Sequence, residues 1–301
     1  MFDLLSSTTR CLGVVALRGL FLASVMTVIL AFAEPSTGML LRPAAEGPLA
    51  ERPRHTSVAA DYTDEYRWWQ GAPSVKMKNS VRWVCFLTRI GGKFEGGGEY
   101  VRAFIWKGDW WLGGASQQKG VNAGARCVSI TGRMFAYSDE FSWAQGQSAV
   151  FMGDAATRVC FLTRVGGGFE GYGERVEILK SSLPPYGNGF YLGGKSKQSG
   201  VHARARCIVY GPPGAWYLNP SNGVQLYPPY AEPRAANKYY PNVYLYLEKK
   251  SSVCFLVGMS GKFEGGGEYI QTVLSAYSNK WYEHPSSMQV QPAQVTAGCV
   301  Y

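Results

Sequence analysis

Hydrophobic and polar positions alternate strictly in three separate stretches of the chain. Small apolar residues occupy every second position, and each stretch ends in cysteine: Val121, Ala123, Ala125, Cys127; then Val201, Ala203, Ala205, Cys207; then Ala293, Val295, Ala297, Cys299. A period of two is typical of a β-strand that buries one face and exposes the other. The small side chains predict that the buried face packs closely against another strand.

A second pattern precedes each of these stretches. It consists of a Val-Cys-Phe-Leu run, a glycine-rich segment and a further alternating stretch, and it begins at Val84, Val159 and Val253. The run is rich in aromatic and β-branched residues, which favours a strand. The glycine-rich segment 91–98 predicts a turn, because glycine adopts positive φ without a steric penalty. Cys85 and Cys160 are 75 residues apart, so the chain repeats one module.

The repeat divides the chain into successive segments. An opening motif, residues 62–71, returns at 137–146, and the third copy of the module lacks a clear equivalent. Prolines between Gly211 and Tyr240 favour a linker or insertion there. The predicted segments are a signal peptide (1–33), a flexible leader (34–60), β repeat 1 (61–135), β repeat 2 (136–210), a Pro/Tyr-rich linker or insertion (211–240) and β repeat 3 (241–301).

The predicted fold class is all-β, with three tandem antiparallel modules of five or six short strands each, small and sandwich- or barrel-like. Two arrangements remain open. Sequential modules packed side by side are favoured by the length of the repeat and by the insertion before the third copy. The alternative is a pseudo-threefold arrangement around a common core. Under the first arrangement, residues 61–135 are expected to fold alone.

The N-terminus predicts export. Arg10 and Arg18 precede an apolar run that ends in Ala-Phe-Ala before Glu34 and Pro35, which is typical of a secretory signal peptide. A membrane anchor is the alternative, but a span needs about 20 apolar residues and this run is shorter. We therefore expect cleavage after Ala33, no stable membrane span afterwards, and a secreted, cell-surface or periplasmic protein.

The chain is basic. Removal of residues 1–33, with Arg10, Arg18 and Asp3, lowers its formal net charge only from +9 to +8. A basic protein is attracted to anionic surfaces and polymers. Because the Lys and Arg residues form no dense run, specific nucleic-acid binding is not expected.

Six cysteines remain after cleavage, and six cysteines allow fifteen pairings. The repeat favours one bond within each module: Cys85 with Cys127, Cys160 with Cys207, and Cys254 with Cys299. Each such bond would stabilise the fold by about 4 kcal/mol in the chain-entropy treatment. Zinc binding is the alternative, but no Cys-x-x-Cys or paired-His pattern occurs.

These motifs together resemble a known type of repeat. Cys-Phe-Leu-Thr, Gly-x-Phe-x-Gly-x-Gly-Glu, aromatic-Leu-Gly-Gly and Val-x-Ala-x-Ala-Arg-Cys look like a cysteine-bounded β-repeat of uncharacterised exported bacterial proteins and of phage tail-fibre tips. The resemblance covers most of residues 75–301. It implies recognition of surfaces by analogy. The third module departs from the pattern at Trp281-Tyr282-Glu283-His284.

Carboxylates recur at the glycine-rich turn of every module. The pairs are Glu95 and Glu99, Glu170 and Glu174, and Glu264 and Glu268. They can accept hydrogen bonds from turn amides, hold an ion such as Ca²⁺, or act in acid–base catalysis. Their presence in all three copies favours the structural role. No catalytic residue, metal site or cofactor is predicted.

Aromatic and polar residues in turns are the remaining candidates for ligand binding. Trp68 and Trp143 occupy equivalent positions and are expected in the core, whereas Trp106 precedes a turn and has no equivalent tryptophan. The loop after each Leu-Gly-Gly strand is polar, and loops often carry recognition. The predicted ligand-binding residues are Trp106, Gln117, Gln118, Lys195, Lys197 and Gln198.

The sequence thus predicts a multivalent binding protein, lectin-like or adhesin-like, for a surface glycan or anionic polymer. Two other functions remain open. One is a structural or matrix protein that self-assembles through its modules. The other is a hydrolase whose carboxylates are dispersed in sequence.

Overall fold

The structure is a computed structural model that describes residues 61–118, 120–130, 135–171, 173–181, 187–198, 200–210, 243–248, 253–286 and 293–300. These residues belong to one compact unit, 55–301. The predicted signal peptide, the leader and the linker at 211–240 lie outside the described residues.

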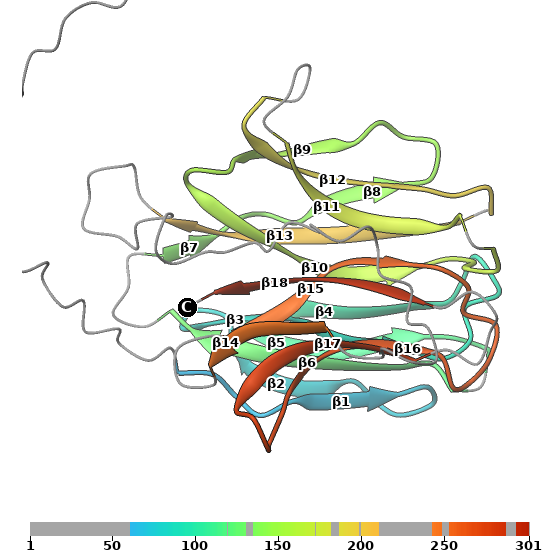
Figure 1. Ribbon diagram of the computed structural model, residues 1–301, viewed down its shortest axis with the longest axis horizontal. Helices are drawn as coiled ribbons and strands as arrows, with labels where there is room; N and C mark the ends of the chain where they lie inside the picture. The colour runs from blue at the N-terminus through green and yellow to red at the C-terminus, as the bar shows by residue number, and fades with distance from the viewer. Residues whose placement is uncertain are drawn as a thin grey trace, which may run out of the picture. The chain divides into compact units, whose positions relative to one another are not determined.

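The described part of the chain is all-β, as predicted, and its strands form three antiparallel sheets (Figure 1). Sheet A has the order β1 (Tyr66–Trp69), β6 (Asn122–Ser129), β3 (Trp83–Gly91), β16 (Tyr269–Leu274), β17 (Lys280–Ser286), β14 (Val243–Glu248). Sheet B has the order β2 (Val75–Asn79), β5 (Asp109–Ala115), β4 (Tyr100–Trp106), β10 (Arg158–Gly166), β13 (His202–Tyr210), β7 (Phe135–Tyr137), with β8 (Phe141–Ala144) also paired to β13. Sheet C has the order β18 (Gln294–Val300), β15 (Val253–Ser260), β11 (Arg175–Ser181), β12 (Gly189–Lys195), β9 (Val150–Asp154).

Each sheet combines strands from two repeats. β4 of the first repeat pairs with β10 of the second, β11 of the second pairs with β15 of the third, and β16 of the third pairs with β3 of the first. The third repeat therefore closes back onto the first. The expectation of modules packed side by side is wrong, and the pseudo-threefold arrangement is the observed one.

One core lies where the three sheets meet. The rings of Phe86, Phe161 and Phe255 are fully buried, with centroids 4.9–6.0 Å apart. A second ring of phenylalanines comes from the glycine-rich segments. Phe94, Phe169 and Phe263 contact one another at 6.2 Å, and their backbones close a cycle of three N–H···O bonds of 2.7–2.8 Å. Since every repeat contributes to both clusters, the hydrophobic core belongs to all three repeats together.

A β-bulge shapes the strand that contains the Val-Cys-Phe-Leu run in each repeat. The register shifts between Leu87 and Arg89 in β3 and between Leu162 and Arg164 in β10, and the same shift follows Leu256 in β15. A bulge inserts one residue and turns the following side chains to the other face of the sheet. Five consecutive residues, up to and including the bulge residue, are buried in β3 and β10, and Arg89 and Arg164 emerge on the outer face.

The three predicted disulfides are confirmed. Cys85–Cys127, Cys160–Cys207 and Cys254–Cys299 each join directly opposed residues of a strand pair. The bonds close loops of 42, 47 and 45 residues in sequence separation. Each bond lies within one repeat, so the links between repeats are non-covalent pairings and packing, apart from the chain itself.

The opening motif covers the outer edge of two of these strand pairs. β1 pairs with β6, and β8 pairs with β13. Trp68 and Trp143 are buried as expected, and their rings fill the space over Gly114 and Gly194, where a Cβ would lie within 2.8 Å of ring atoms. A Cβ there would also lie 2.3 Å from the backbone oxygen of Tyr100 or Arg175, and the two contacts together explain the second glycine of the Leu-Gly-Gly motif.

Candidate functional site

The outer faces of the three sheets carry equivalent rows of side chains with different charges. Strand register aligns the residue after the bulge with one residue on each neighbouring strand. The rows are Gly124, Arg89, Gln271, His284 in sheet A; Arg204, Arg164, Arg102, Gly113 in sheet B; and Thr296, Gly258, Glu177, Gly193 in sheet C. The position of the neutral Gln271 on sheet A is therefore occupied by the cationic Arg102 on sheet B and by the acidic Glu177 on sheet C.

The row on sheet B places three arginines directly opposite one another on adjacent strands. Arg204, Arg164 and Arg102 are all half-buried. Like charges placed opposite each other destabilise a sheet. Glu140 pairs with Arg204 at 2.9 Å, and the buried Nε atoms of Arg102 and Arg164 have no hydrogen-bond partner in the described part of the chain. The pKa of Arg164 is lowered by burial and by the charges of Arg204 and Arg102.

Aromatic rings separate these cations along β4. The guanidinium of Arg164 lies 3.9 Å from the ring centroid of Tyr100, and that of Arg102 lies 4.0 Å from the centroid of Phe104. Such cation–π contacts stabilise arginines that lack a carboxylate partner.

Trp106 lies at the C-terminal end of β4, the strand that carries Tyr100, Arg102 and Phe104. It is 51% exposed, contacts Trp111 edge-to-face at 5.5 Å, and has the ammonium of Lys107 4.6 Å from its centroid. Lys107 and Gly108 both have positive φ, which is typical of a two-residue hairpin turn. Six residues separate Trp106 from Tyr100, or about 20 Å along a strand. The structure therefore does not place Trp106 beside the polar loops with which the sequence grouped it.

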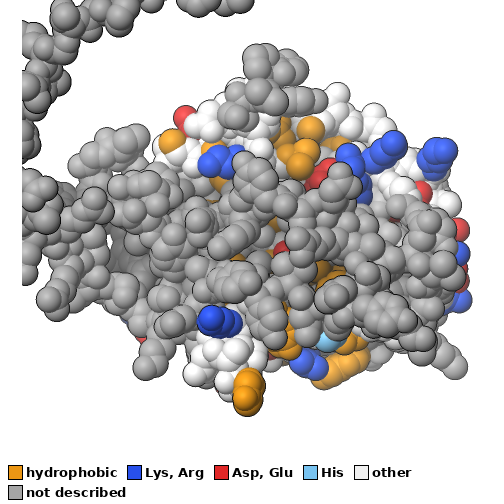
Figure 2. All heavy atoms as spheres, viewed as in Figure 1, with side chains coloured by type: hydrophobic (Ala, Val, Ile, Leu, Met, Phe, Trp, Pro, Cys, Tyr) orange, Lys and Arg blue, Asp and Glu red, His pale blue; other side chains and the backbone are white. Residues whose placement is uncertain are grey.

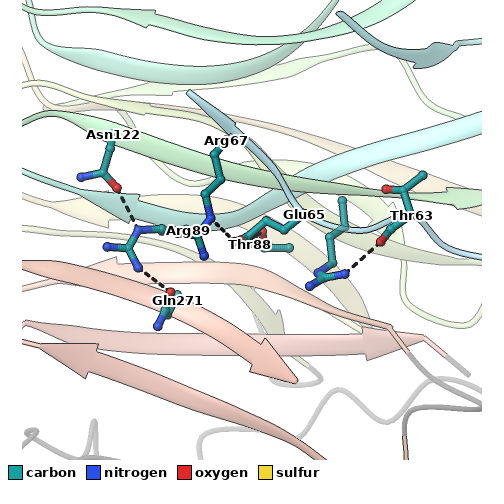
Figure 3. Close-up of polar contacts among 8 residues, drawn as sticks. Thr63, Glu65, Arg67, Thr88, Arg89, Asn122 and Gln271 are labelled. Atoms are coloured by element: carbon teal, nitrogen blue, oxygen red, sulfur yellow. Dashed lines mark hydrogen bonds and ion pairs between the residues drawn. The ribbon is translucent and has the colours of Figure 1, made fainter. Parts of the chain in front are cut away.

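The equivalent arginine on sheet A is engaged by neutral side chains. Arg89 donates from Nε to Asn122 Oδ1 at 2.8 Å and from Nη1 to the Oε1 of Gln271, as Figure 3 shows. Glu65 accepts from the hydroxyl of the bulge residue Thr88 at 2.7 Å and pairs with Arg67 at 2.9 Å (Figure 3). On sheet B, His202 and Arg102 stand where Asn122 and Gln271 stand on sheet A.

The predicted loop cations lie on sheet C. Lys195 ends β12 directly opposite Arg175 of β11, and both are exposed. Lys197 is exposed two residues further on, and its backbone N–H lies 3.4 Å from Glu174 Oε1. Figure 2 shows Lys and Arg side chains, with some Asp and Glu side chains among them, on the right-hand side of the view, toward which β11 and β12 extend in Figure 1. Arg175 also pairs with Glu177 at 2.9 Å.

The loop glutamines differ in exposure. Gln117 is exposed, whereas Gln118 and Gln198 are half-buried. The backbone N–H groups of Gln118 and Gln198 each donate to a serine hydroxyl two residues earlier, at 2.9 Å in both loops. This shared turn shapes the loop, and exposed residues that differ between the two copies are Ala115 and Lys195, and Gln117 and Lys197.

The turn carboxylates separate into two kinds. Glu99, Glu174 and Glu268 are at least 95% buried, and one oxygen of each packs against the glycine three residues earlier. Glu95, Glu170 and Glu264 are half-buried, and Glu95 and Glu264 pair with Lys93 and Lys262 at 2.6 Å. Within the described ranges, no group of three His, Cys, Asp or Glu side chains could hold a metal ion.

Sequence reasoning did not single out the arginine row, Tyr100, Phe104 or His202. A signal for part of it was present, because the polar positions between the alanines of a period-two strand must face outward, and His202 and Arg204 are two of these. The bulge after Leu162, which turns Arg164 outward, has no signature that a period of two can reveal.

No helix in the described residues is long and apolar enough to cross a membrane. Searches with protein-family models, among curated proteins and among solved structures gave no match to the chain. The function is therefore inferred from the outer faces themselves.

Proposed function

We propose that this chain is an exported, disulfide-stabilised binding protein that attaches to an anionic polymer through the outer face of sheet B. The observation that carries the proposal is the row of Arg102, Arg164 and Arg204, three opposed cations with one carboxylate, Glu140, paired to the row. A polyanion laid across these strands would offset their mutual repulsion.

The aromatic side chains beside the arginine row indicate which class of polyanion the surface binds. One guanidinium group lies over the ring of Tyr100 and another over that of Phe104. Single-stranded nucleic acids are bound largely by stacking bases on open aromatic faces, and one face of each of these two rings is already occupied. Guanidinium groups fixed on rings suit carboxylate or sulfate groups instead. We therefore favour an acidic polysaccharide over nucleic acid.

Replacing Arg102 and Arg164 by glutamine, the residue that sheet A has at the first of these positions, tests the proposal. We expect binding of the purified, oxidised chain to dextran sulfate to weaken by about a hundredfold, since one charge-assisted contact contributes about 1.5–3 kcal/mol. Binding can be measured by calorimetry at several salt concentrations, and salt should weaken it.

A charge-matched control separates this site from general attraction. Arg67→Gln with Arg82→Gln also removes two positive charges, from exposed positions outside sheet B. This variant should bind dextran sulfate almost as the wild type does, and neutral dextran should bind to neither. Equal weakening in the two double variants would mean that net charge alone drives binding.

Binding should also strengthen on acidification through His202. Its Nδ1 lies 2.8 Å from Gly200 O, its Nε2 is buried without a hydrogen-bond partner among the residues that the structure describes, and it lies near Arg164, Arg204 and Tyr100. Burial and these two arginines lower the pKa of His202, so the ring is neutral near pH 7. A bound anion favours protonation, and affinity should therefore rise as the pH falls below about 6.5.

His202→Asn, which places on sheet B the residue that sheet A has, should remove this rise while retaining binding at neutral pH. Dextran sulfate is a suitable ligand because sulfate esters keep their charge over this range. An unchanged pH profile in the variant would assign the effect to another group, such as His284.

A further inference from the structure

We infer that the cationic surface continues from sheet B onto sheet C through the loop 195–202, and that its ligand is an extended polyanion rather than a compact one. This inference rests on the proposed function and specifies its ligand class. The surface on sheet C, the sheet C cluster, consists of Arg175, Lys195 and Lys197.

Chain connectivity joins the row of arginines to the sheet C cluster. Lys195 ends β12 in sheet C, and His202 begins β13 in sheet B only seven residues later. The described residues of the loop between them pack against glycine-rich turns: Gln198 lies beside Gly168, and Gly200 approaches Gly97 of the first repeat. The loop is therefore a bridge between the two sheets.

Strand register places both surfaces at the same end of the sheets. Arg175 and Tyr100 are the first residues of the equivalent strands β11 and β4, and His202 is the first residue of β13. The row of arginines begins two residues further along these strands, about 7 Å away. A chain that crosses the row can thus continue over Lys197 toward Lys195 and Arg175.

The arginine row of sheet B and the sheet C cluster together form a cationic band. Nearby acidic side chains do not neutralise the charge of this band. Glu140 and Glu177 are paired with Arg204 and Arg175, respectively, and Glu170 is half-buried in the turn beside Gly168. Six cations of the band face these three carboxylates and the buried Glu174, whose Oε1 lies 3.4 Å from the backbone N–H of Lys197. The equivalent loop of the first repeat has Ala115 and Gln117 where the second has Lys195 and Lys197, so of these two loops only that of the second repeat carries this lysine pair.

A ligand that reaches both surfaces gains affinity because its second contact is intramolecular. A compact polyanion can occupy only one surface at a time. Binding to sucrose octasulfate and to long dextran sulfate, measured by calorimetry on the oxidised full chain, separates these cases. We expect the wild type to bind long dextran sulfate more tightly by at least tenfold, compared per mole of binding site.

Lys195→Ala with Lys197→Ala should weaken binding of dextran sulfate by about tenfold and leave binding of sucrose octasulfate on sheet B nearly unchanged. Both lysines are exposed, so the fold should persist. The control variant is Arg67→Gln with Arg82→Gln, which removes the same charge from exposed positions outside sheet B. It should bind both ligands as the wild type does.

The outcomes distinguish this inference from the proposed function. If the wild type binds neither ligand, the proposed function itself fails. If it binds dextran sulfate and the Lys195/Lys197 variant binds it equally well, sheet B acts alone and the extended band is refuted. Tighter binding of single-stranded DNA than of dextran sulfate would overturn the assignment to polysaccharides.

Discussion

Residues 61–135, prepared alone with the Cys85–Cys127 bond intact, should not fold as a monomer. In the full chain, β3 pairs with β16 and β4 pairs with β10, so the isolated repeat loses a partner strand on both sides. It also loses two members of each phenylalanine triad, including Phe161 and Phe255 around Phe86. Removing one large core ring costs about 3–5 kcal/mol, and a domain's whole stability is about 5–15 kcal/mol.

Circular dichroism would measure the β structure of the fragment 61–135, and sedimentation at low concentration would measure whether it is monomeric. The matched control is the whole chain 61–301 at the same concentration, which should be folded and cooperative in unfolding. A monomeric fragment with β structure and a cooperative transition would contradict the shared core and restore the autonomous modules that the sequence alone favoured.

Glu283→Gln should stabilise the protein by about 3 kcal/mol above pH 7, and the gain should vanish in acid. Glu283 stands where the other repeats have the fully buried Leu112 and Leu192. Burial raises the pKa of its carboxyl from 4.5 to about 7, opposed in part by the N–H of Ala297, which donates to Oε1 at 2.8 Å. Glutamine retains an acceptor for this N–H group and carries no charge.

The direction in which stability changes with pH follows from the number of protons bound by the folded and unfolded states. Because the folded-state pKa lies above 4.5, the folded protein binds more protons than the unfolded chain between pH 4.5 and about 7. Wild-type stability should therefore fall as the pH rises through this range and level off above it. Urea unfolding at about pH 5 and about pH 8 would show the effect.

Glu264→Gln, a half-buried surface change in the same repeat, is the control for this experiment. It removes a pairing with Lys262 of the kind that contributes about 1 kcal/mol or less. If Glu283→Gln shows the same pH dependence as the wild type, the carboxyl of Glu283 is not the group that titrates.

The local fold could be predicted because its determinants are local. Alternation from Val121 to Cys127 indicates a strand, and the position of the cysteines in each repeat indicates the disulfide partners. The pairing between repeats could not be predicted in this way. An antiparallel strand such as β4 presents the same pattern whether its partner is β3 or β10, and the choice depends on the core formed by all three repeats.

The site was predicted only in part. Lys195 and Lys197 stand out in sequence because they replace neutral residues of an otherwise similar loop, and both are exposed. The arginine row is assembled from two repeats by register and by a bulge. Arg102 and Arg164 are 62 positions apart, so no local pattern connects them.

The closed order of the repeats also bears on how the faces could diverge. Three separate identical chains joined by the same strand exchange would form a ring with threefold symmetry, and all its faces would be alike. Covalent linkage removes that constraint. Each sheet can mutate independently while the strand exchange between repeats is retained, so Arg164 and Gly258 can occupy equivalent positions on two faces of one molecule. A tandem chain thus obtains asymmetric specificity from a symmetric scaffold.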